Sequence, residues 1–384
     1  MPAVTRTFTL QQEDQLTIST HAGTFFHNTP SGPQQSTIRS TMATPSFSLL
    51  LLLFLSLLNP TPSHQKPLQT SPYLSPTTVL FPDYNKMLAN FKIHVYSPEN
   101  PASITFATPS ESLFHASLLN SQFITDDPNE AHLFYLPFPP DTSTRSISRL
   151  VETLKVNFTY WYRSLGADHF FLSCAGIGYP PERNILELKK NSVQISCFPT
   201  ASGNFFPHKD IVLPPVADVV LAPVGDKTPA FWGFMKRDEG SELVKELEGD
   251  PEFLIEAEPS DLGRSKFCLF VYGGDVSWIG EALRLGCVPV VITDRPIQDM
   301  PLIDVVRWSE IAVFVGSGGG AGELKRVLSG IGGEEYERMK GLGVTAGQHF
   351  VWNEVPQPFD AFHMVMYQLW LRRHTIRYAR REWI

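Results

Sequence analysis

The sequence predicts an α/β protein with two domains, each built on a parallel sheet. Residues 265–292 show the clearest pattern: an apolar run of strand length, a glycine turn, a helix and a second apolar run. Short apolar strands and amphipathic helices also alternate upstream, between residues 91 and 213. Pro214 and Pro215 then interrupt the chain before the second series begins. This alternation is typical of domains in which helices cover a parallel sheet.

The stretch 265–292 predicts a unit of two strands joined through a helix. Its strands are Phe267–Tyr272 and Val288–Ile292, both continuous apolar runs that suit burial on both faces of a sheet. Gly286 suits the left-handed position after the end of the helix. Because the connection is a helix and not a tight turn, the two strands should be parallel.

The turn between the first strand and the helix suits an anion. Gly273 and Gly274 let a ligand approach the backbone closely. Asp275 or Ser277 can cap the helix that follows, and its free N–H groups and dipole favour a phosphate or diphosphate. Glu281, near the start of that helix, could bond the hydroxyls of an attached ribose. A purely structural turn is the alternative, because two glycines before a helix are weak evidence alone.

The first domain is expected to span residues 81–215. Its strands are predicted at Ile93–Tyr96, Leu133–Phe138, His169–Leu172, Val193–Ser196 and Ile211–Leu213, and its helices at Ser112–Leu119 and Ser146–Leu165. The second domain is expected to span residues 216–355, followed by a C-terminal helix and tail, 356–384. That helix, Asp360–His374, should pack on the body through an apolar face of Phe362, Val365, Met366 and Leu369.

The first eighty residues have a different composition. Residues 1–46 are rich in Thr, Ser, Gln and Pro and predict an unstructured extension. Residues 47–58 form a twelve-residue apolar run, whereas a spanning helix wants about 20 residues and a signal peptide core about 7 to 15. A cleaved signal peptide and a short type II signal-anchor therefore both stay open, with a buried core helix as a third alternative. Residues 59–80 are Pro-rich and predict a stem.

Charge and cysteine content exclude two kinds of ligand. The 384 residues carry 31 Lys and Arg against 39 Asp and Glu, a net charge of −8, so nucleic acid is not an expected partner. The four cysteines have no zinc-site spacing, which argues against a thiolate metal site. Cys174 and Cys197 flank one strand-loop-strand segment and are candidates for a disulfide. Cys268 and Cys287 lie in or beside strands and are expected to be buried thiols.

These motifs resemble the C-terminal signature of the exostosin-type glycosyltransferases, in particular the plant members that build cell-wall polysaccharides. The shared pattern is SKFCL, a glycine turn, a helix with Glu and Ala, then GCVPV and a nearby acidic residue, which here is Asp294. Further matches include FKIHVY, FITDDPNEAHLFYLPF and YWYRSLGADHFFLSC upstream, and DVVRWSEIAVFV, HFVWN and FDAFHM downstream. The resemblance covers roughly residues 90–375.

The resemblance implies a fold and an activity. The expected fold is GT-B-like, with two Rossmann-like domains facing a cleft, the acceptor domain first and the donor domain second. The expected reaction is an inverting transfer of a sugar from a nucleotide sugar, foremost a UDP-sugar, to a cell-wall or matrix glycan, with no further cofactor. The family implies a type II Golgi membrane protein with a luminal catalytic domain, secreted if residues 47–58 are cleaved off, which can associate with other glycosyltransferases.

The donor site is expected to work without a metal. The chain has no Asp-x-Asp triplet, the usual means of holding a divalent cation on a sugar nucleotide. The leaving diphosphate must then be stabilised by helix-end N–H groups and by a cation such as Arg264 or Lys266. The complete set of expected donor-binding residues is Arg264, Ser265, Lys266, Gly273, Gly274, Asp275, Ser277 and Glu281.

The catalytic base is expected at Asp168 or His169, in the segment GADHFF. The alternatives are a hydrogen-bonded structural histidine and an aspartate that caps an element. The chain departs from many relatives directly afterwards, because residues 175–178 replace their His-Asp-Trp-Gly, and it lacks their Ser-Pro-Arg between the glycine turn and Glu281. A catalytically inactive relative that binds glycan or stabilises a partner transferase is therefore the second hypothesis.

The sequence also contains the sequon Asn157-Phe158-Thr159. It lies toward the end of the predicted helix Ser146–Leu165. Luminal topology would expose it to N-glycosylation, although a chance match to so short a motif is common.

Overall fold

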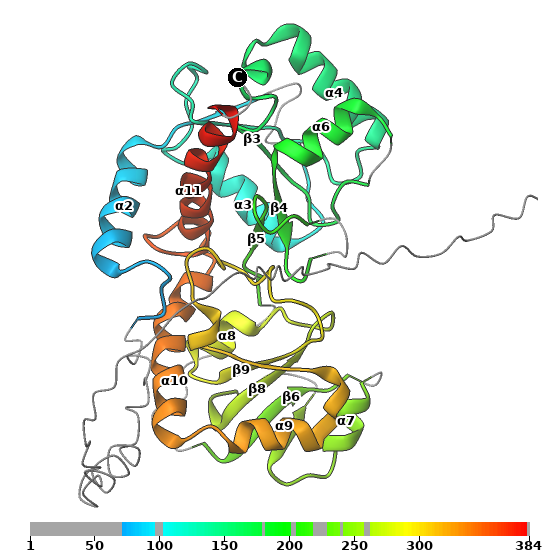
Figure 1. Cartoon of the computed structure of the whole chain (residues 1–384), viewed down its shortest axis with the longest axis vertical. Coiled ribbons are helices and arrows are strands. Elements are labelled where there is room, and N and C mark those ends of the chain that lie inside the picture. Colours follow the sequence, from blue (N-terminus) through cyan, green and yellow to red (C-terminus); the bar gives the residue numbers. More distant parts are fainter. Residues whose placement is uncertain are drawn as a thin grey trace, which may run out of the picture. The chain divides into compact units, whose positions relative to one another are not determined.

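A computed structural model describes residues 71–96, 103–178, 181–200, 205–217, 229–238, 241–256 and 262–381 (Figure 1). All of them belong to one compact unit, Pro67–Ile384. The predicted extension, the apolar run 47–58 and residues 59–70 of the predicted stem lie outside the described residues. No helix within the described ranges is long and apolar enough to cross a membrane.

The first domain contains a five-stranded sheet in which all neighbouring strands are parallel. The strands are β1 (Ile93–Val95), β2 (Leu133–Tyr135), β3 (His169–Leu172), β4 (Val193–Cys197) and β5 (Ile211–Leu213), and they lie in sequence order. β3 and β5 have the predicted bounds. Because β2, β3 and β5 are buried at every position, each could be recognised as a largely apolar run.

Helices cover both faces of this sheet (Figure 1). α3 (Pro109–Leu119) and α11 (Ala361–Arg381) pack on one face, and α4 (Thr144–Asn157) and α6 (Arg183–Asn191) pack on the other. The predicted helix Ser146–Leu165 is in fact two helices, α4 and α5 (Tyr160–Ser164). The break falls at Phe158, whose backbone is extended and whose ring contacts that of Tyr96.

The second domain contains another five-stranded parallel sheet. Its strands are β6 (Phe231–Lys236), β7 (Phe253–Glu256), β8 (Ser265–Val271), β9 (Val288–Ile292) and β10 (Val313–Val315), in the order β10-β9-β8-β6-β7. Its helices are α7 (Glu242–Leu247), α8 (Ile279–Arg284), α9 (Gly320–Ser329) and α10 (Gly333–Gly347). α7 and α9 pack together on one face, and α8 packs on the other against α10.

The central unit β8–α8–β9 matches the prediction except at the start of its helix. Gly286 has the expected left-handed backbone, with φ 77°. However, α8 begins only at Ile279, and Trp278 occupies the cap position without a side-chain bond to the helix. Asp275 instead accepts the N–H of Ser277 at 3.0 Å and closes a tight turn. The predicted caps therefore shape the loop and do not cap the helix.

Two disulfides lie within the described residues. Cys174 and Cys197, the candidate pair, are joined with Cα atoms 4.7 Å apart. Cys268 and Cys287 are also joined, with Cα atoms 5.7 Å apart, so the expectation of two thiols there was wrong. β8 and β9 pair in parallel, which brings the residue before β9 beside the buried part of β8.

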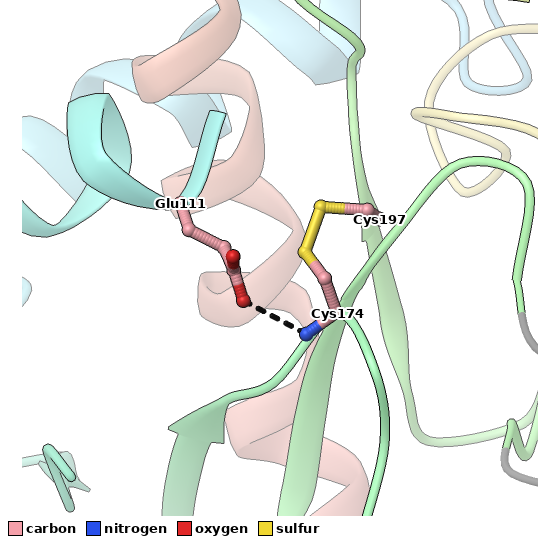
Figure 2. A group of neighbouring side chains, drawn as sticks. All are labelled: Glu111, Cys174 and Cys197. Atoms are coloured by element: carbon pink, nitrogen blue, oxygen red, sulfur yellow. Dashed lines mark hydrogen bonds between the residues drawn. A yellow bond between two sulfur atoms is a disulfide. The ribbon is translucent and has the colours of Figure 1, made fainter. Parts of the chain in front are cut away.

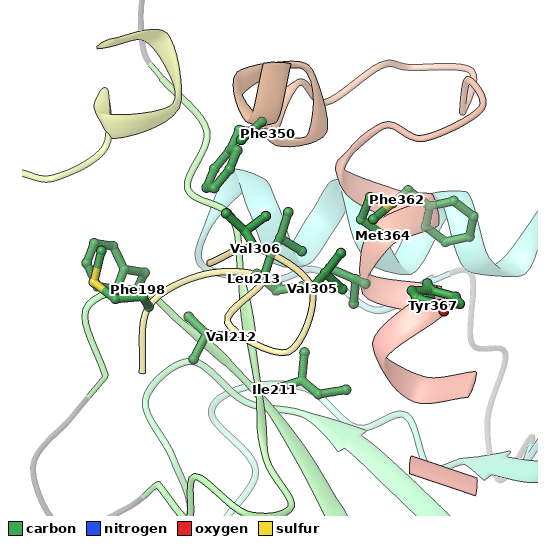
Figure 3. Packing of buried hydrophobic residues seen from close by; sticks show 14 of the residues in the cluster. Phe198, Ile211, Val212, Leu213, Val305, Val306, Phe350, Phe362, Met364 and Tyr367 are labelled. Carbon is green, nitrogen blue, oxygen red and sulfur yellow. The ribbon is translucent and has the colours of Figure 1, made fainter. Parts of the chain in front are cut away.

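The two sheets share one hydrophobic cluster (Figure 3). β5 and the N-terminal end of α11 meet the loop that carries Val305 and Val306, together with Phe350. The Nε1–H of Trp352 also donates to the carbonyl of Pro214 at 2.9 Å. Because apolar packing and hydrogen bonds both join the sheets, α11 and these loops connect the domains into a single body.

Residues 71–80, the described part of the predicted stem, belong to this body. The N–H of Leu74 bonds the carbonyl of Val305 at 2.9 Å, and Tyr73 pairs with Val306 as an isolated antiparallel bridge. α2 (Thr77–Asn90) follows at once and buries Leu80 against the core. Its start at Thr77 precedes the expected domain boundary at residue 81.

Candidate functional site

The order of the second sheet points to a ligand site. β7 lies on one side of β6, whereas β8, β9 and β10 follow on the other, so the winding direction reverses between β6 and β8. Ligands of open α/β sheets bind beyond the carboxyl ends of the strands at such a reversal, because the loops there diverge and leave a crevice.

A hollow of about 480 Å³ lies at this place. Its lining comes from the ends of β6 and β8 and the loops that follow them: Met235, Lys236, Arg237, Asp238, Leu269, Val271, Gly274, Asp275 and Trp278. A second hollow of about 420 Å³ adjoins it over β9, β10 and the starts of α7 and α9, and shares Asp238 and Val271 with the first. Together they follow the carboxyl edge of the sheet.

Opposite charges meet inside the first hollow. The Nζ of Lys236 lies 2.5 Å from the Oδ2 of Asp275, and both side chains are partly exposed. Partial burial raises the pKa of Asp275, but the hydrogen bonds from Lys236 and Ser277 outweigh it, so this pKa lies below its usual value. Asp275 is therefore ionised. Arg237, which follows Lys236, also lines the hollow and pairs with Glu248 at 2.5 Å.

Part of the predicted donor-binding set lies at this edge. Gly273, Gly274, Asp275 and Ser277 all follow β8, and two of them, Gly274 and Asp275, line the first hollow. Gly273 has φ 96°, a backbone conformation that side chains rarely adopt. The glycine turn thus lies where a ligand can approach the backbone.

Arg264, Ser265 and Lys266 lie at the wrong end of β8. They mark its amino end, and a strand of seven residues spans roughly 20 Å at about 3.3 Å per residue. Arg264 lies over the ring of Phe231, Lys266 lies over the ring of Tyr336, and Ser265 is buried. The structure therefore does not bring them to the glycine turn, and their contact with a diphosphate stays a prediction.

Glu281 has a partner within its own helix. Its carboxylate accepts the Nε–H of Arg284 at 3.1 and 3.2 Å and lines neither of the two hollows. Its role at a ribose stays a prediction.

Asp168 and His169 also lie at an amino edge, that of β3. His169 is fully buried, with Nδ1 2.8 Å from Asp168 Oδ1 and Nε2 3.0 Å from the hydroxyl of Tyr96. Burial lowers the pKa of His169 more than Asp168 raises it. Asp168 also pairs with Arg163 at 2.9 Å. These contacts are those of a structural network, so neither residue is placed to take a proton from an acceptor at the carboxyl edge.

Glu111 and the disulfide Cys174–Cys197 form a compact group that resembles a ligand set (Figure 2). The sulfur atoms are bonded to each other and are not thiolates. The carboxylate of Glu111 accepts the N–H of Cys174 at 2.9 Å and closes a capping box with Thr108 at the start of α3. The group therefore fastens α3 to the ends of β3 and β4 and has no free thiolate for a metal.

Asp299 joins the two domains where their carboxyl edges meet. It accepts hydrogen bonds from the hydroxyl of Thr200, which follows β4, and from that of Tyr272, which follows β8. Burial and the adjacent carboxylate raise the pKa of Tyr272 to about 12. No local sequence pattern indicates this contact, because Thr200 and Asp299 are 99 residues apart. Lys236 was also missed, since β6 was not among the predicted strands.

Comparisons with known proteins agree with this architecture. The family described as the exostosin GT47 domain matches residues 87–318. A probable glycosyltransferase of Arabidopsis thaliana is 30% identical over 336 residues, which cover 77% of this chain and 64% of that protein. A probable beta-1,4-xylosyltransferase of the same plant is 26% identical over 333 residues, 74% of this chain and 78% of that protein.

Among solved structures, the crystal structure of a GtfA/B complex matches with a TM-score of 0.36 at 10% identity, over 68% of this chain and 60% of that chain. The fold is therefore described from the two parallel sheets above and not from this similarity. The chain spans less than two thirds of the first relative, but the family match extends over more than half of the chain itself. The chain therefore belongs to the exostosin GT47 family.

Proposed function

We propose that this protein is a glycosyltransferase that moves a sugar, with inversion, from a nucleotide sugar to a cell-wall or matrix glycan. The family and the names of the relatives support the reaction class, and a UDP-sugar is the first candidate donor. The observation that carries the proposal is the hollow at the reversal of the second sheet, where Lys236 reaches Asp275 in the glycine turn.

The donor diphosphate would bind in this hollow. Lys236 and a turn that admits close backbone approach can contact a phosphate group, whereas Arg237 is paired with Glu248. Lys236 now pairs with Asp275, and a diphosphate would take over that cation. Because fixed cations and N–H groups can stabilise the departing charge, the reaction would need no divalent metal.

In the reaction an acceptor hydroxyl attacks the anomeric carbon, the bond from that carbon to the diphosphate breaks, and the hydroxyl proton passes to a base. Negative charge grows on the diphosphate as its bond breaks. Interactions that strengthen toward the transition state act on rate more than on substrate affinity. Lys236 is therefore expected to affect turnover as well as donor binding.

The test is equilibrium binding and transfer with a panel of nucleotide sugars. Lys236→Ala should weaken donor affinity by about tenfold to a hundredfold, the equivalent of the roughly 1.5 to 3 kcal/mol of a hydrogen bond to a charged group. Lys266→Ala removes the same charge at the opposite edge of the sheet and is the matched control. Equal effects of the two variants on donor affinity would contradict the proposed site. A loss of transfer on chelation that manganese restores would contradict metal independence.

A second candidate is a non-catalytic member that binds donor or glycan and stabilises another transferase. Two observations favour it: Asp168 and His169 are buried at an amino edge, and residues 175–178 lack the His-Asp of many relatives. Such a protein would bind a nucleotide sugar, depend on Lys236 for this, and form no product with any acceptor.

We also propose a luminal position in the Golgi, with residues 47–58 as a type II anchor. Two disulfides support this, because such bonds persist in the oxidising secretory pathway and are rare in the cytosol. Protease protection in sealed microsomes tests it: digestion of the domain without detergent would contradict luminal topology.

A further inference from the structure

We propose that Asn157 carries an N-linked glycan and that its first sugars cover an exposed apolar surface on α4 and α5. We call the side chains of Val156, Phe158, Tyr162 and Leu165 the 156–165 surface. The proposal needs the luminal topology proposed above but no catalytic activity.

The sequon is presented in an accessible form. Asn157 is the last residue of α4, and Phe158 after it has φ −131° and ψ 130°, an extended conformation. Asn157 and Thr159 are both exposed, and the Asn157 carboxamide bonds no other described residue. A sequon inside a helix would have to unwind before an enzyme could bind it in an extended form, whereas this one leaves the helix at its middle residue.

Exposed apolar side chains concentrate around this sequon. Val156 is 75% exposed, Tyr162 61%, Leu165 53% and Phe158 39%. They are four of the ten large apolar residues of the described ranges that are exposed, and they fall within ten positions of the chain. Single exposed apolar residues are ordinary, but four so close together in the chain make this segment a candidate for cover.

A glycan fits this surface better than a protein does. A pyranose has an apolar face of C–H groups that can pack on an aromatic ring, and a rim of hydroxyls that stays in water. Phe158 is the residue next to Asn157, and its ring is held against Tyr96 with centroids 5.3 Å apart, which fixes it as a platform. A protein partner, in contrast, needs roughly 800 Å² of contact surface on this side.

The modification itself is a transfer by the host cell. An oligosaccharide on a lipid diphosphate is the co-substrate: the bond from its first sugar to the phosphate breaks, a bond to the Nδ2 of Asn157 forms, one amide proton is lost and the lipid diphosphate leaves. The chain contains a single Asn-x-Ser/Thr sequon in which x is not proline, so any N-glycan can be assigned to this residue.

The experiment uses the full chain expressed in plant cells. Wild type and Thr159→Ser should both migrate faster on a gel after treatment with peptide N-glycosidase, whereas Asn157→Gln and Thr159→Ala should show no shift. Thr159→Ser and Thr159→Ala change the same residue and differ in whether the sequon is kept. If the mobility of wild type does not change after the treatment, the proposal is wrong. Protease protection then distinguishes a wrong topology from an unmodified Asn157 in a luminal domain.

Covering is tested separately from attachment. The unglycosylated Asn157→Gln variant should bind more of an apolar dye and self-associate more than wild type. Adding Tyr162→Ser to it should reverse both effects, because the exposed ring is then gone. If Asn157→Gln loses its glycan but binds dye and elutes as wild type does, the glycan does not cover the 156–165 surface and this part of the proposal is wrong.

Discussion

Tyr73→Phe tests whether the segment before α2 belongs to the fold. The hydroxyl of Tyr73 lies 2.7 Å from Nε2 of His349, and Nδ1 of His349 lies 2.7 Å from the carbonyl oxygen of Phe359. A carbonyl can only accept, so Nδ1 carries the proton and Nε2 accepts from Tyr73. Both side chains are buried, Tyr73 at 6% exposure and His349 at 5%, so water does not readily replace the lost hydroxyl.

The substitution should lower the free energy of unfolding by about 1 to 3 kcal/mol, the cost of leaving one buried acceptor without a partner. Phenylalanine keeps the ring contacts of Tyr73 with Phe81 and His349, so packing is little changed. Tyr162→Phe is the matched control. It removes the same atom from a side chain that is 61% exposed and should cost nothing measurable.

The pH dependence gives a second check. Burial lowers the pKa of His349 more than its bond to Phe359 raises it, so the folded value lies below the unfolded value of about 6.5. As pH falls below about 6.5 the unfolded chain takes up a proton that the folded chain refuses, and stability is lost. In Tyr73→Phe the free Nε2 takes up a proton more easily. The difference in stability between wild type and variant should therefore shrink toward low pH.

Urea unfolding of both variants and wild type at pH 7.5 and 5.5 measures these quantities. Comparing variants isolates His349, because every other histidine contributes equally to each curve. If Tyr73→Phe unfolds like wild type and like Tyr162→Phe, residues 71–74 are not fixed to the body. If the difference grows at pH 5.5, the assigned tautomer is wrong.

Three further predictions concern the junction, a disulfide and the candidate site. Thr200→Val should lower the free energy of unfolding by about 1.5 to 3 kcal/mol, because it removes a hydrogen bond to a carboxylate; urea unfolding measures this, and no change would mean that Asp299 does not join the domains. The double change Cys268→Ser with Cys287→Ser opens a 19-residue link and should cost about 3 kcal/mol in the same assay, whereas an unchanged midpoint would contradict the bond. In transfer assays at saturating donor, Lys236→Ala should lower kcat, and a change in KM alone would mean that Lys236 does not act on the leaving group.

Several buried strands could be predicted because they appear in the sequence as unbroken apolar runs. Val288–Ile292 is buried at every position, and a strand of this kind shows an unbroken apolar run that local pattern can recognise. The turn at Gly273 and the helix end at Gly286 were equally clear, because each needs a backbone conformation that favours glycine.

β6 was not predicted because Gly233 interrupts its apolar run. The space that a side chain at Gly233 would occupy is filled by a side chain of a neighbouring strand. A Cβ on Gly233 would come within 2.6 Å of two atoms of the Phe253 ring, so the glycine admits a ring from the adjacent strand β7. A glycine inside an apolar run weakens the sequence signal for a strand. The reason for this glycine becomes visible only in the pairing of β6 with β7. With β6 missing, the cation at its end, Lys236, could not be placed at the site.

Strand direction explains why the other predicted site residues do not meet at one edge. Arg264 and Lys266 are close to the glycine turn in sequence, and Asp168 and His169 are close to the predicted strand β3, but all four lie at amino ends. In a parallel sheet every carboxyl end lies at one edge, so a residue before a strand is separated from that edge by the whole strand. Groups that meet both substrates should follow strands. Thr200 follows β4, Tyr272 follows β8, and Asp299 binds both hydroxyls. Residues that position the acceptor against the donor are therefore expected at that junction and not at the amino ends.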